Sequence, residues 1–446
     1  MDVPPTADLA GRSLTPATGR SGRLGAEVRM RVAVVGSGIA GAAAAWLLSR
    51  RHDVTLLERA GRPGGHTDTL DVPAPGGGTR PVDTGFIVHN VPTYPLLTRL
   101  FDELGVATAP SDMSWSLTCA RCDLEYAGSA RGVLAQPRRA LDPRHWRMLV
   151  DVARFNRAAL RGHREGTLDD GPLDGFLAAN GLGDGLRRHY LLPMAAAIWS
   201  SGTADAAGFP TRSLVAFFAN HGLLGLRSHH PWRTVVGGAR TYLTRLLAPL
   251  GDRVRTGTPV RRVERRADGP HVTTDAGTER YDAVVLAGHA DESLALLADP
   301  SDDERELLGA WRASRNERWV HTDAGLLPRR RAAWASWNYH VEDCRTPTTS
   351  ASLDYHMNRL QGLDGPEQVL VSINPPRPPR AGTVLRRDAV THPTFDAAAV
   401  ATQPALDGLN GVRGTFFAGA WQRWGFHEDG LWSAVRVAGH LGVAWP

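Results

Sequence analysis

The sequence predicts an α/β protein in which a Rossmann-like nucleotide-binding domain is interleaved with an α+β substrate domain. Three observations predict this class. An apolar strand runs into a glycine-rich turn and a helix from residue 31, and another apolar strand ends in glycine at 415–419. Helical and strand-like runs fill the long stretches between them. Strands that alternate with helices are typical of a parallel sheet covered by helices.

The first turn has the glycine spacing of a dinucleotide-binding motif, and it directly follows the predicted strand 31–35. In such a turn the first glycine allows the tight bend, the second lets the backbone approach a pyrophosphate, and the third lets the helix pack closely on the sheet. The free amides at the start of the helix then bind the pyrophosphate. The residues expected to hold it are Gly36, Gly38, Ile39, Ala40 and Gly41.

An acidic residue, Glu58, closes the next predicted strand, 54–58. A carboxylate at this position accepts hydrogen bonds from the ribose hydroxyls of an adenosine. A 2′-phosphate beside it would be repelled, so the sequence argues against NADP.

A second pair of glycines follows the acidic residue and distinguishes a flavin from a nicotinamide. From Glu58 the chain reads E-x-x-x-x-x-G-G, which resembles the signature of the flavin amine oxidase and phytoene desaturase superfamily. Glycines here are otherwise ordinary turn formers. The resemblance implies FAD as the cofactor. It places these residues on the nucleotide: Arg59, Gly64, Gly65, His66 and Thr67.

The C-terminal segment supports the same cofactor. The predicted strand 415–420 contains Gly419, and residues 425–438 read as a turn that enters a helix. In the superfamily this helix aims its N-terminus at the flavin, where its dipole stabilises the reduced anion. The resemblance therefore implies cofactor contacts at Glu428, Asp429 and Gly430, and an adenine contact from the backbone of Val260.

Further segments narrow the resemblance to a bacterial group of NAD/FAD-binding flavoproteins. They are residues 82–90, 111–116, 192–200, 335–340, 355–361 and 425–430, and the likeness covers nearly everything from residue 31 onward. Members of this group are associated with cyclopropane-fatty-acid-synthase-like methyltransferases, and some are implicated as desaturases of methylated acyl chains. The resemblance thus implies a lipid or fatty acyl substrate and a methyltransferase as a candidate partner.

The predicted domains follow the interleaved pattern of the superfamily. A FAD-binding domain of the glutathione-reductase type takes residues 30–90, 231–300 and 411–446. The substrate domain takes residues 91–230 and 301–410. The runs 234–238, 253–256 and 260–264 are expected to return to the first strands, and 281–287 and 368–373 to form strands. Residues 1–29 lack an apolar core and predict a disordered extension, neither a signal peptide nor a membrane anchor.

Composition sets further limits. The 446 residues are 42% hydrophobic, enough for two large cores. Three cysteines provide no disulfide framework, which fits a reducing cytoplasm. Cys119 and Cys122 form a C-x-x-C without a second pair or a histidine at zinc spacing, so we expect a hairpin turn and assign no role. The net charge of +5 comes without any nucleic-acid-binding motif, so no nucleic-acid partner is predicted.

Two apolar runs, 190–199 and 214–226, suggest what the substrate domain binds. They are either core helices or the wall of an acyl channel. Basic residues beside them, including Arg187, Arg188 and Arg227, would suit a phospholipid headgroup, and a mildly basic surface can favour anionic lipids. The expected location is therefore cytoplasmic, with peripheral membrane contact left open.

The chain contains no lysine. The lysine–water pair that many amine oxidases of the superfamily place at the flavin therefore cannot form, which disfavours amine oxidation by that arrangement. Desaturation needs the flavin as hydride acceptor and a base at the neighbouring carbon. The candidates, each of which could instead bind the cofactor or cap a helix, are His427, Glu428, His89 and Tyr355.

These observations predict an FAD-dependent oxidoreductase that removes hydrogen from an unsaturated or methyl-branched acyl chain. A double-bond isomerase that returns the hydride to its substrate is the first alternative, and an amine oxidase is the next. A non-catalytic flavoprotein that binds lipid or a methyltransferase is a further alternative of a different class.

Overall fold

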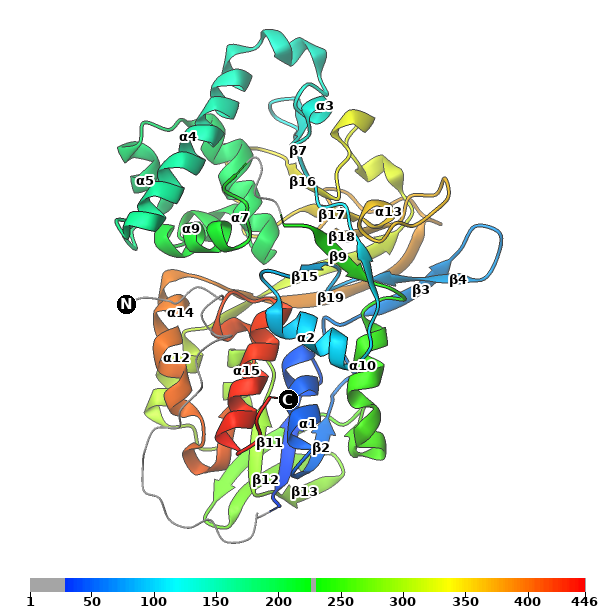
Figure 1. The fold of residues 1–446 in the computed structure, drawn as a ribbon, viewed down its shortest axis with the longest axis vertical. Coiled ribbons are helices and arrows are strands. Elements are labelled where there is room, and N and C mark those ends of the chain that lie inside the picture. Colours follow the sequence, from blue (N-terminus) through cyan, green and yellow to red (C-terminus); the bar gives the residue numbers. More distant parts are fainter. Residues whose placement is uncertain (1–28, 226–229, 446) are drawn as a thin grey trace.

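The computed structural model describes residues 29–225 and 230–445, which form two layered regions (Figure 1). The predicted N-terminal extension 1–29 therefore lies outside the described residues except for Arg29. Among the described helices, none is long and apolar enough to cross a membrane.

A parallel sheet forms the centre of the lower region in Figure 1. Among the described residues it has five strands in the order β10-β2-β1-β14-β20, and β1 pairs with both β2 and β14. The strands are β1 (Arg31–Val35), β2 (Asp53–Leu57), β10 (Val254–Arg255), β14 (Ala283–Leu286) and β20 (Thr415–Phe417). Each ends at the same edge of the sheet, where ligands bind in open α/β sheets.

Alternate side chains of this sheet enter two different cores. Val32 and Val34 pack with helices on one face, whereas Ala33 packs on the other. The helices of the first face are α1 (Ile39–Leu48), α2 (Pro95–Glu103), α10 (Arg240–Leu247) and α15 (His427–His440). The antiparallel sheet on the second face is β11 (Val260–Arg266), β12 (Gly269–Thr274) and β13 (Gly277–Arg280). Helices α11 (Ala290–Leu296), α12 (Asp302–Gly309) and α14 (Ala397–Thr402) also contribute to this side.

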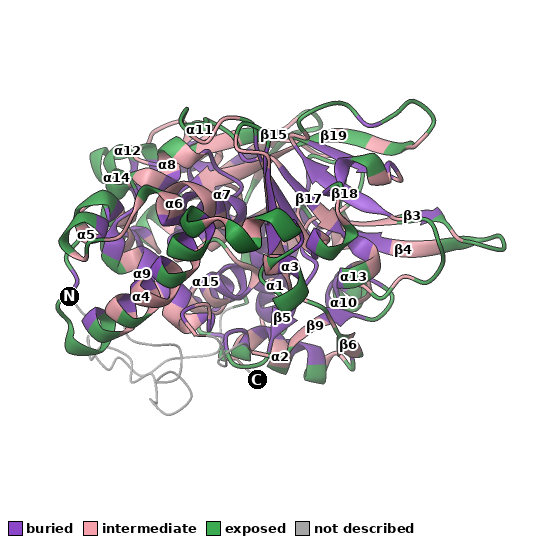
Figure 2. Ribbon diagram, turned by 90° about the horizontal axis from the view of Figure 1, so that it is seen from above, coloured by how far each residue is buried: buried purple, intermediate pink, exposed green. Residues whose placement is uncertain are grey.

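The runs 234–238 and 260–264 do not join the nucleotide-binding sheet, contrary to our expectation. The second run forms β11, which pairs with β12 in the separate antiparallel sheet. Strand β9 (Trp232–Val235) pairs instead with β5 (His89–Asn90) and β6 (Thr108–Pro110) in a small antiparallel sheet. A separate hairpin, β3 (Thr69–Pro73) and β4 (Thr79–Asp83), extends to one side with an exposed tip (Figure 2). An apolar run predicts a strand but does not identify its partner.

The upper region is built on a sheet that, within the described residues, has seven strands in the order β19-β15-β18-β17-β16-β7-β8. They are β7 (Trp115–Cys119), β8 (Leu124–Ala127), β15 (Arg312–His321), β16 (Trp337–Val341), β17 (Leu353–His356), β18 (Leu370–Ile373) and β19 (Val384–Thr394). Two short helices, α3 (Ala130–Val133) and α13 (Met357–Leu360), accompany it.

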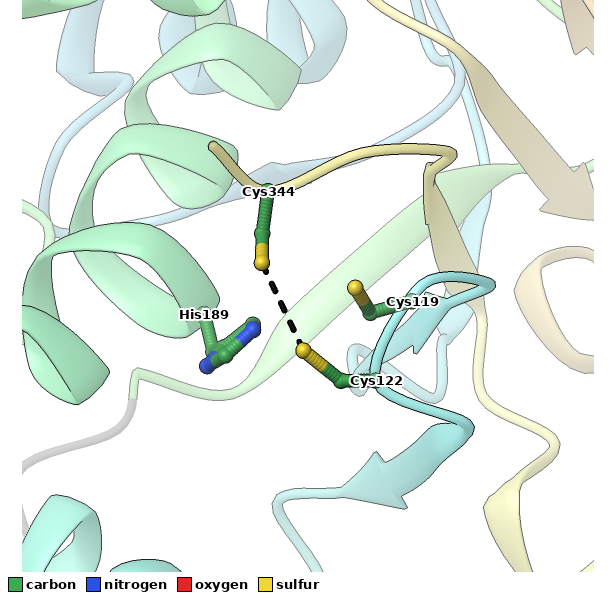
Figure 3. Close-up of side chains that lie close together, drawn as sticks. All are labelled: Cys119, Cys122, His189 and Cys344. Atoms are coloured by element: carbon green, nitrogen blue, oxygen red, sulfur yellow. Dashed lines mark hydrogen bonds between the residues drawn. The ribbon is translucent and has the colours of Figure 1, made fainter. Parts of the chain in front are cut away.

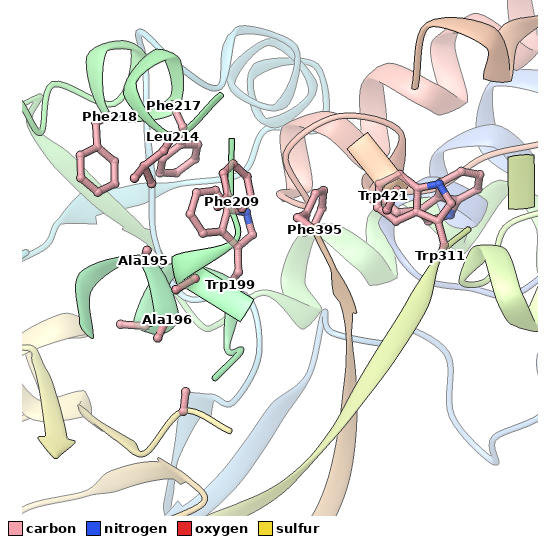
Figure 4. Packing of buried hydrophobic residues seen from close by; sticks show 14 of the residues in the cluster. Ala195, Ala196, Trp199, Phe209, Leu214, Phe217, Phe218, Trp311, Phe395 and Trp421 are labelled. Carbon is pink, nitrogen blue, oxygen red and sulfur yellow. The ribbon is translucent and has the colours of Figure 1, made fainter. Parts of the chain in front are cut away.

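A lobe of helices lies beside this sheet, and its buried side chains pack tightly (Figures 1 and 4). The ring of Trp199 stacks on Phe209 with centroids 4.5 Å apart and lies 5.0 Å from Phe217. The lobe consists of α4 (Pro143–Glu165), α5 (Leu173–Ala179), α6 (Asp184–Leu186), the π-turn 187–191, α7 (Leu192–Trp199), α8 (Thr203–Ala207) and α9 (Thr211–Asn220).

Candidate functional site

The β1–α1 turn has the geometry that its glycines predict. The amide of Gly36 donates to the Leu57 carbonyl over 2.9 Å, and its φ of +97° favours glycine. A Cβ at Gly41 would lie 1.9 Å from the Gly36 carbonyl oxygen, so only glycine fits. A Cβ at Gly38 would meet no described atom within 4 Å. The protein itself therefore does not need glycine at 38, and the open space there fits a cofactor phosphate.

The first turn of α1 offers its backbone amides to an anion. Gly38 precedes the helix without a side-chain cap from the described residues, and the first turn carries no acidic residue. Ile39 and Ala40 supply the next amides of this turn. Gly430 of α15 lies against them, because a Cβ there would be 2.8 Å from the Cγ2 of Ile39. This site fits the pyrophosphate of FAD.

The Glu58 carboxylate organises the ribose side of the site and is largely used by protein donors. Its Oε2 accepts from the amide of Ser37 at 3.0 Å and from the Ser37 hydroxyl at 2.5 Å, and its Oε1 accepts from the Ala60 amide at 2.8 Å. A carboxylate has about four lone-pair positions. One lone-pair position on Oε1 is left, so Glu58 can accept a hydrogen bond from one of the two ribose hydroxyls.

The second glycine pair faces the first turn. The amide of Gly64 donates to the Ser37 hydroxyl over 2.9 Å, and a Cβ at Gly65 would lie 3.2 Å from the Cα of Gly38. Arg59 is mostly exposed and pairs with Glu292 at 3.0 Å. The structure thus brings the two glycine-rich segments together. The identity of each contacting residue stays a prediction.

Thr67 and His427 meet next to this loop. The Thr67 hydroxyl lies 2.9 Å from the Tyr242 hydroxyl and 3.1 Å from Nε2 of His427. The His427 ring stacks on Phe86 at 3.9 Å. Burial, with a smaller effect of His66, lowers the pKa of His427 to about 3, so its imidazole is neutral at pH 7.

Two more imidazoles, His66 and His392, lie at the boundary between the two regions. Their ring centroids are 5.1 Å apart. Burial lowers the pKa of His66 to about 4 and that of His392 well below its usual value. The Nε2 of His66 is buried and has no partner among the described side chains and backbone. An unpartnered buried nitrogen beside the glycine loop also fits a cofactor that completes its hydrogen bonding.

A polar chain leads from this boundary to Tyr355. The Asn316 amide donates to Nδ1 of His392 at 3.0 Å and contacts the Ser200 carbonyl at 3.2 Å. Ser200 hydrogen-bonds the Tyr355 hydroxyl, and burial raises the pKa of Tyr355 to about 12. Tyr355, predicted as a catalytic candidate, is thus connected to the His392–His66 pair through two residues that the sequence did not indicate.

An ion network that the sequence did not reveal joins the glycine loop to the upper sheet. Asp68 is fully buried and pairs with Arg62, with Arg318 at 2.9 Å and with Arg386 at 2.5 Å. These arginines hold the pKa of Asp68 far below its usual value, despite burial that acts in the opposite direction. Arg318 also bonds Asp388 and the Thr84 carbonyl. Arginine and aspartate spacing alone carries no signal for such a network.

Glu428 and Asp429 are used at helix starts. The Glu428 carboxylate accepts from the amides of Leu96 at 3.0 Å and Leu97 at 2.9 Å, at the N-terminus of α2, and burial raises its pKa to about 7. The Asp429 carboxylate accepts from the Phe426 amide at 2.9 Å. The structure therefore gives Glu428 a capping role, and its predicted catalytic role stays untested.

The other predicted residues lie deeper. His89 is 1% exposed, its ring lies 5.1 Å from Phe101, and burial lowers its pKa to about 4. Phe86 lies between it and His427. Gly419 is buried, with its amide bonded to Ser433. Val260 begins β11, close in sequence to Thr258, whose amide bonds the Glu58 carbonyl. The cofactor contacts of Gly419 and Val260 remain predictions.

The two apolar runs form mainly core helices in the described residues. Half-buried apolar side chains nevertheless follow one another at helical spacing toward the sheet: Tyr190, Met194 and Ile198. The Tyr190 ring meets Trp115 at 5.8 Å, and Trp337 meets Tyr355 at 5.0 Å. We call these six residues the aromatic stripe. The expected basic rim is neutralised where it is described, because Arg187 pairs with Asp174 and Arg188 with Asp184; Arg227 lies outside the described residues.

Cys119 and Cys122 lie in the hairpin that the sequence predicts, at the end of β7 and in the turn to β8. The third cysteine, Cys344, and His189 lie beside them, so the histidine that the C-x-x-C lacked in sequence is supplied in space. Sequence spacing could not reveal ligands that far apart.

The sequence was also compared with models of known protein families. Residues 39–373 match the model of the family flavin containing amine oxidoreductase. The chain belongs to this family. The match confirms the predicted class of FAD-dependent oxidoreductase and the predicted FAD cofactor.

One named relative of this flavin amine oxidoreductase matches part of its sequence. A putative flavin-containing monoamine oxidase AofH of Mycobacterium tuberculosis is 30% identical over 287 residues, covering 60% of this chain and 59% of the relative. The chain thus matches less than two thirds of that protein.

Solved structures share this fold. A fatty acid isomerase from P. acnes has a TM-score of 0.63 at 18% identity and covers 91% of this chain and 97% of its own. Cyclohexylamine oxidase from Brevibacterium oxydans has a TM-score of 0.66 at 17% identity and covers 93% and 99%. The predicted fold class is confirmed. At this identity the likeness concerns the fold alone.

Proposed function

We propose that this flavoprotein removes hydrogen from an unsaturated, methyl-branched acyl chain of a lipid. The observation that carries the proposal is that the titratable groups described at the boundary between the glycine loop and the upper sheet leave no carboxylate free for an ammonium group. There His66, His392 and His427 have lowered pKa values and are neutral at pH 7. Asp68 of the same loop is already paired with three arginines. An ammonium group would lose its hydration here without gaining a free carboxylate.

The aromatic stripe supports an acyl substrate. It combines half-buried rings with the flexible side chain of Met194, and the polar chain from Tyr355 links it to His392. Burial of about ten methylenes would contribute roughly 8 kcal/mol before ordering costs. A solved protein of the same fold, the fatty acid isomerase, acts on a fatty acid according to its name.

The residues of the site divide into those that would bind FAD and one that would accept a proton from the substrate. The β1–α1 turn, Glu58 and Gly64–Gly65 would hold FAD, which when bound supplies a two-electron acceptor for a hydride. His427, neutral and bonded to Thr67, would accept the proton from the neighbouring carbon. The substrate loses one hydride and one proton and gains one carbon–carbon double bond. Oxygen, a quinone or an electron-transfer protein must then reoxidise the flavin.

Anaerobic mass balance tests this proposal. With a methylated monounsaturated phospholipid, we expect one flavin bleached per product and an acyl chain two mass units lighter. Turnover with unchanged mass and no net bleaching would assign a double-bond isomerase instead. An inert lipid would refute the proposal.

Amine oxidation is the second candidate, since the Mycobacterium tuberculosis relative carries the name of a monoamine oxidase. The same anaerobic assay with a polyamine and an aromatic amine distinguishes it. We expect the flavin to stay oxidised with both. Bleaching by an amine, with the lipid inert, would establish amine oxidation.

His427→Gln tests the assigned base. We expect anaerobic flavin reduction by the lipid to slow at least about tenfold with unchanged flavin content, because general base catalysis contributes about 10²–10⁴-fold. His440→Gln, at the exposed end of the same helix, is the control. A normal rate for His427→Gln would remove His427 from the reaction and make His392 the next candidate.

A further inference from the structure

All three cysteines of the chain gather at one place in the upper region (Figure 3). Cys119 ends β7, Cys122 lies in the turn to β8, and Cys344 lies in the loop after β16. The three thiols are free. The sequence distance of 222 residues between Cys122 and Cys344 shows that the fold, and not local sequence, brings them together.

A histidine completes the group from the helical lobe. His189 lies in the π-turn 187–191, an insertion in a helix that is frequent at functional sites. Its carbonyl accepts a hydrogen bond from the Tyr126 hydroxyl at 2.7 Å, which holds this backbone beside β8. Its Nε2 is buried and finds no hydrogen-bond partner in residues 29–225 and 230–445. Such a nitrogen is available as a ligand.

The distances fit a tetrahedral metal. One ligand atom from each of the four residues lies within 4.8 Å of the others, and the sulfurs of Cys122 and Cys344 are 3.4 Å apart. Around zinc with bonds of about 2.3 Å to sulfur, ligand atoms are about 3.8 Å apart. We propose that Cys119, Cys122, Cys344 and His189 bind a zinc ion as a structural Cys₃His site.

Backbone contacts hold the cysteine segments in place independently of any ion. Strands β7 and β16 pair in parallel with Cys119 opposite Val341. The amides of Ala120 and Arg121 continue this pairing to the carbonyls of Val341 at 2.9 Å and Glu342 at 3.0 Å. The Cys119–Cys122 turn and the loop of Cys344 are thus aligned before a metal binds.

Four protein ligands fill the tetrahedron, which is typical of a structural rather than a catalytic zinc site. The ion would tie together the β7–β8 hairpin, the loop after β16 and the helical lobe. Two of these elements carry Trp115 and Tyr190 of the aromatic stripe. We infer that the metal fixes the lobe against the sheet, and this inference does not depend on the identity of the substrate.

Metal analysis of the full-length flavoprotein tests the site. Protein expressed with added zinc and purified under reducing conditions without chelator should contain about one zinc per chain. Cys344→Ser and His189→Asn should each lower the zinc content about tenfold or more. His271→Asn, in the β12 hairpin with its partner Asp268, should retain zinc. A far-ultraviolet circular dichroism spectrum equal to that of the unaltered chain checks that each variant is folded, and unchanged flavin content shows that the nucleotide-binding region is intact.

Cobalt provides a second measurement on the unaltered chain. After zinc removal, one equivalent of Co²⁺ should give the intense visible bands of a tetrahedral thiolate complex, and zinc should displace them. Zinc below about a tenth of an equivalent, together with no such bands, would overturn the proposal. A Cys122–Cys344 disulfide, detected by mass spectrometry in protein prepared with zinc and reductant, would overturn it in favour of a redox pair.

Discussion

Burial sets the charge state of the individual histidines in this protein. Desolvation lowers the pKa of His66, His89 and His221 to about 4 and that of His427 to about 3. The histidines at the boundary between the regions are therefore neutral at pH 7, and the charges there belong to the Asp68 network. At this scale the chemistry of the site depends on exclusion of water as much as on residue type.

These shifts predict a loss of stability in mild acid. Between pH 6.5 and about 4 the unfolded chain binds protons at histidines that stay neutral in the folded chain, so the free energy of unfolding falls as the pH falls. The raised pKa values of Glu428 and Asp83, both about 7, act in the opposite direction but involve fewer groups. Urea unfolding at pH 7 and pH 5 measures the net effect.

The variant His89→Phe isolates the contribution of one histidine to the pH dependence of the unfolding free energy. The ring of His89 packs among Phe101 and Tyr94, so phenylalanine fits its surroundings. We expect the loss of unfolding free energy between pH 6.5 and 5 to shrink by about 1 kcal/mol per pH unit. An unchanged pH dependence would show that His89 is protonated in the folded chain.

Single residues were predictable where local geometry demanded one residue type. Gly36 and Gly41 were identified because a strand-to-helix turn needs them, and Glu58 because of its place at the end of a strand. Asp68 and Arg318 were not, because their pairing joins residues 250 positions apart, which local spacing does not encode. The same reason explains why the sequence did not reveal that His189 and Cys344 lie beside the C-x-x-C.

At the scale of elements, the β1–α1 turn separates the needs of the fold from those of the cofactor. Gly41→Ala places a methyl group 1.9 Å from the Gly36 carbonyl, so we expect low expression and loss of thermal stability. Gly38→Ala meets no described protein atom, so the apoprotein should unfold at the normal temperature while FAD affinity falls about tenfold or more. Thermal unfolding measures the stability of each variant, and the flavin-to-protein absorbance ratio measures how much FAD it retains. Full flavin content in Gly38→Ala would place the pyrophosphate elsewhere.

For whole elements, the positions of strands were predicted better than their neighbours in the sheets. The strands at 31–35 and 415–417 are present because apolar β-branched and aromatic runs bounded by turns specify them. The placement of β9 and β11 was wrong, because periodicity fixes the type of an element and long-range packing determines its neighbour.

At the scale of the molecule, the Asp68 network holds the two regions together. Asp68→Asn would leave Arg318 and Arg386 without their shared buried partner, so we expect a loss of about 3 kcal/mol in unfolding free energy. Asp275→Asn, which removes the exposed Arg261–Asp275 pair, should cost less than about 1 kcal/mol. Urea denaturation compares the variants. Equal effects would mean that the network does not couple the regions.

The parallel pairing of β7 with β16 also constrains how the chain folds. These strands come from different insertions, with the strands β10 and β14 of the nucleotide-binding sheet between them in sequence. Neither insertion contains a complete upper sheet, so the loop that joins them must close before β7 finds β16. Such closure carries an entropic cost and slows folding in proteins of high contact order. The upper sheet can therefore form only after most of the chain has been synthesised. Residues of the other region emerge from the ribosome before the sheet is complete.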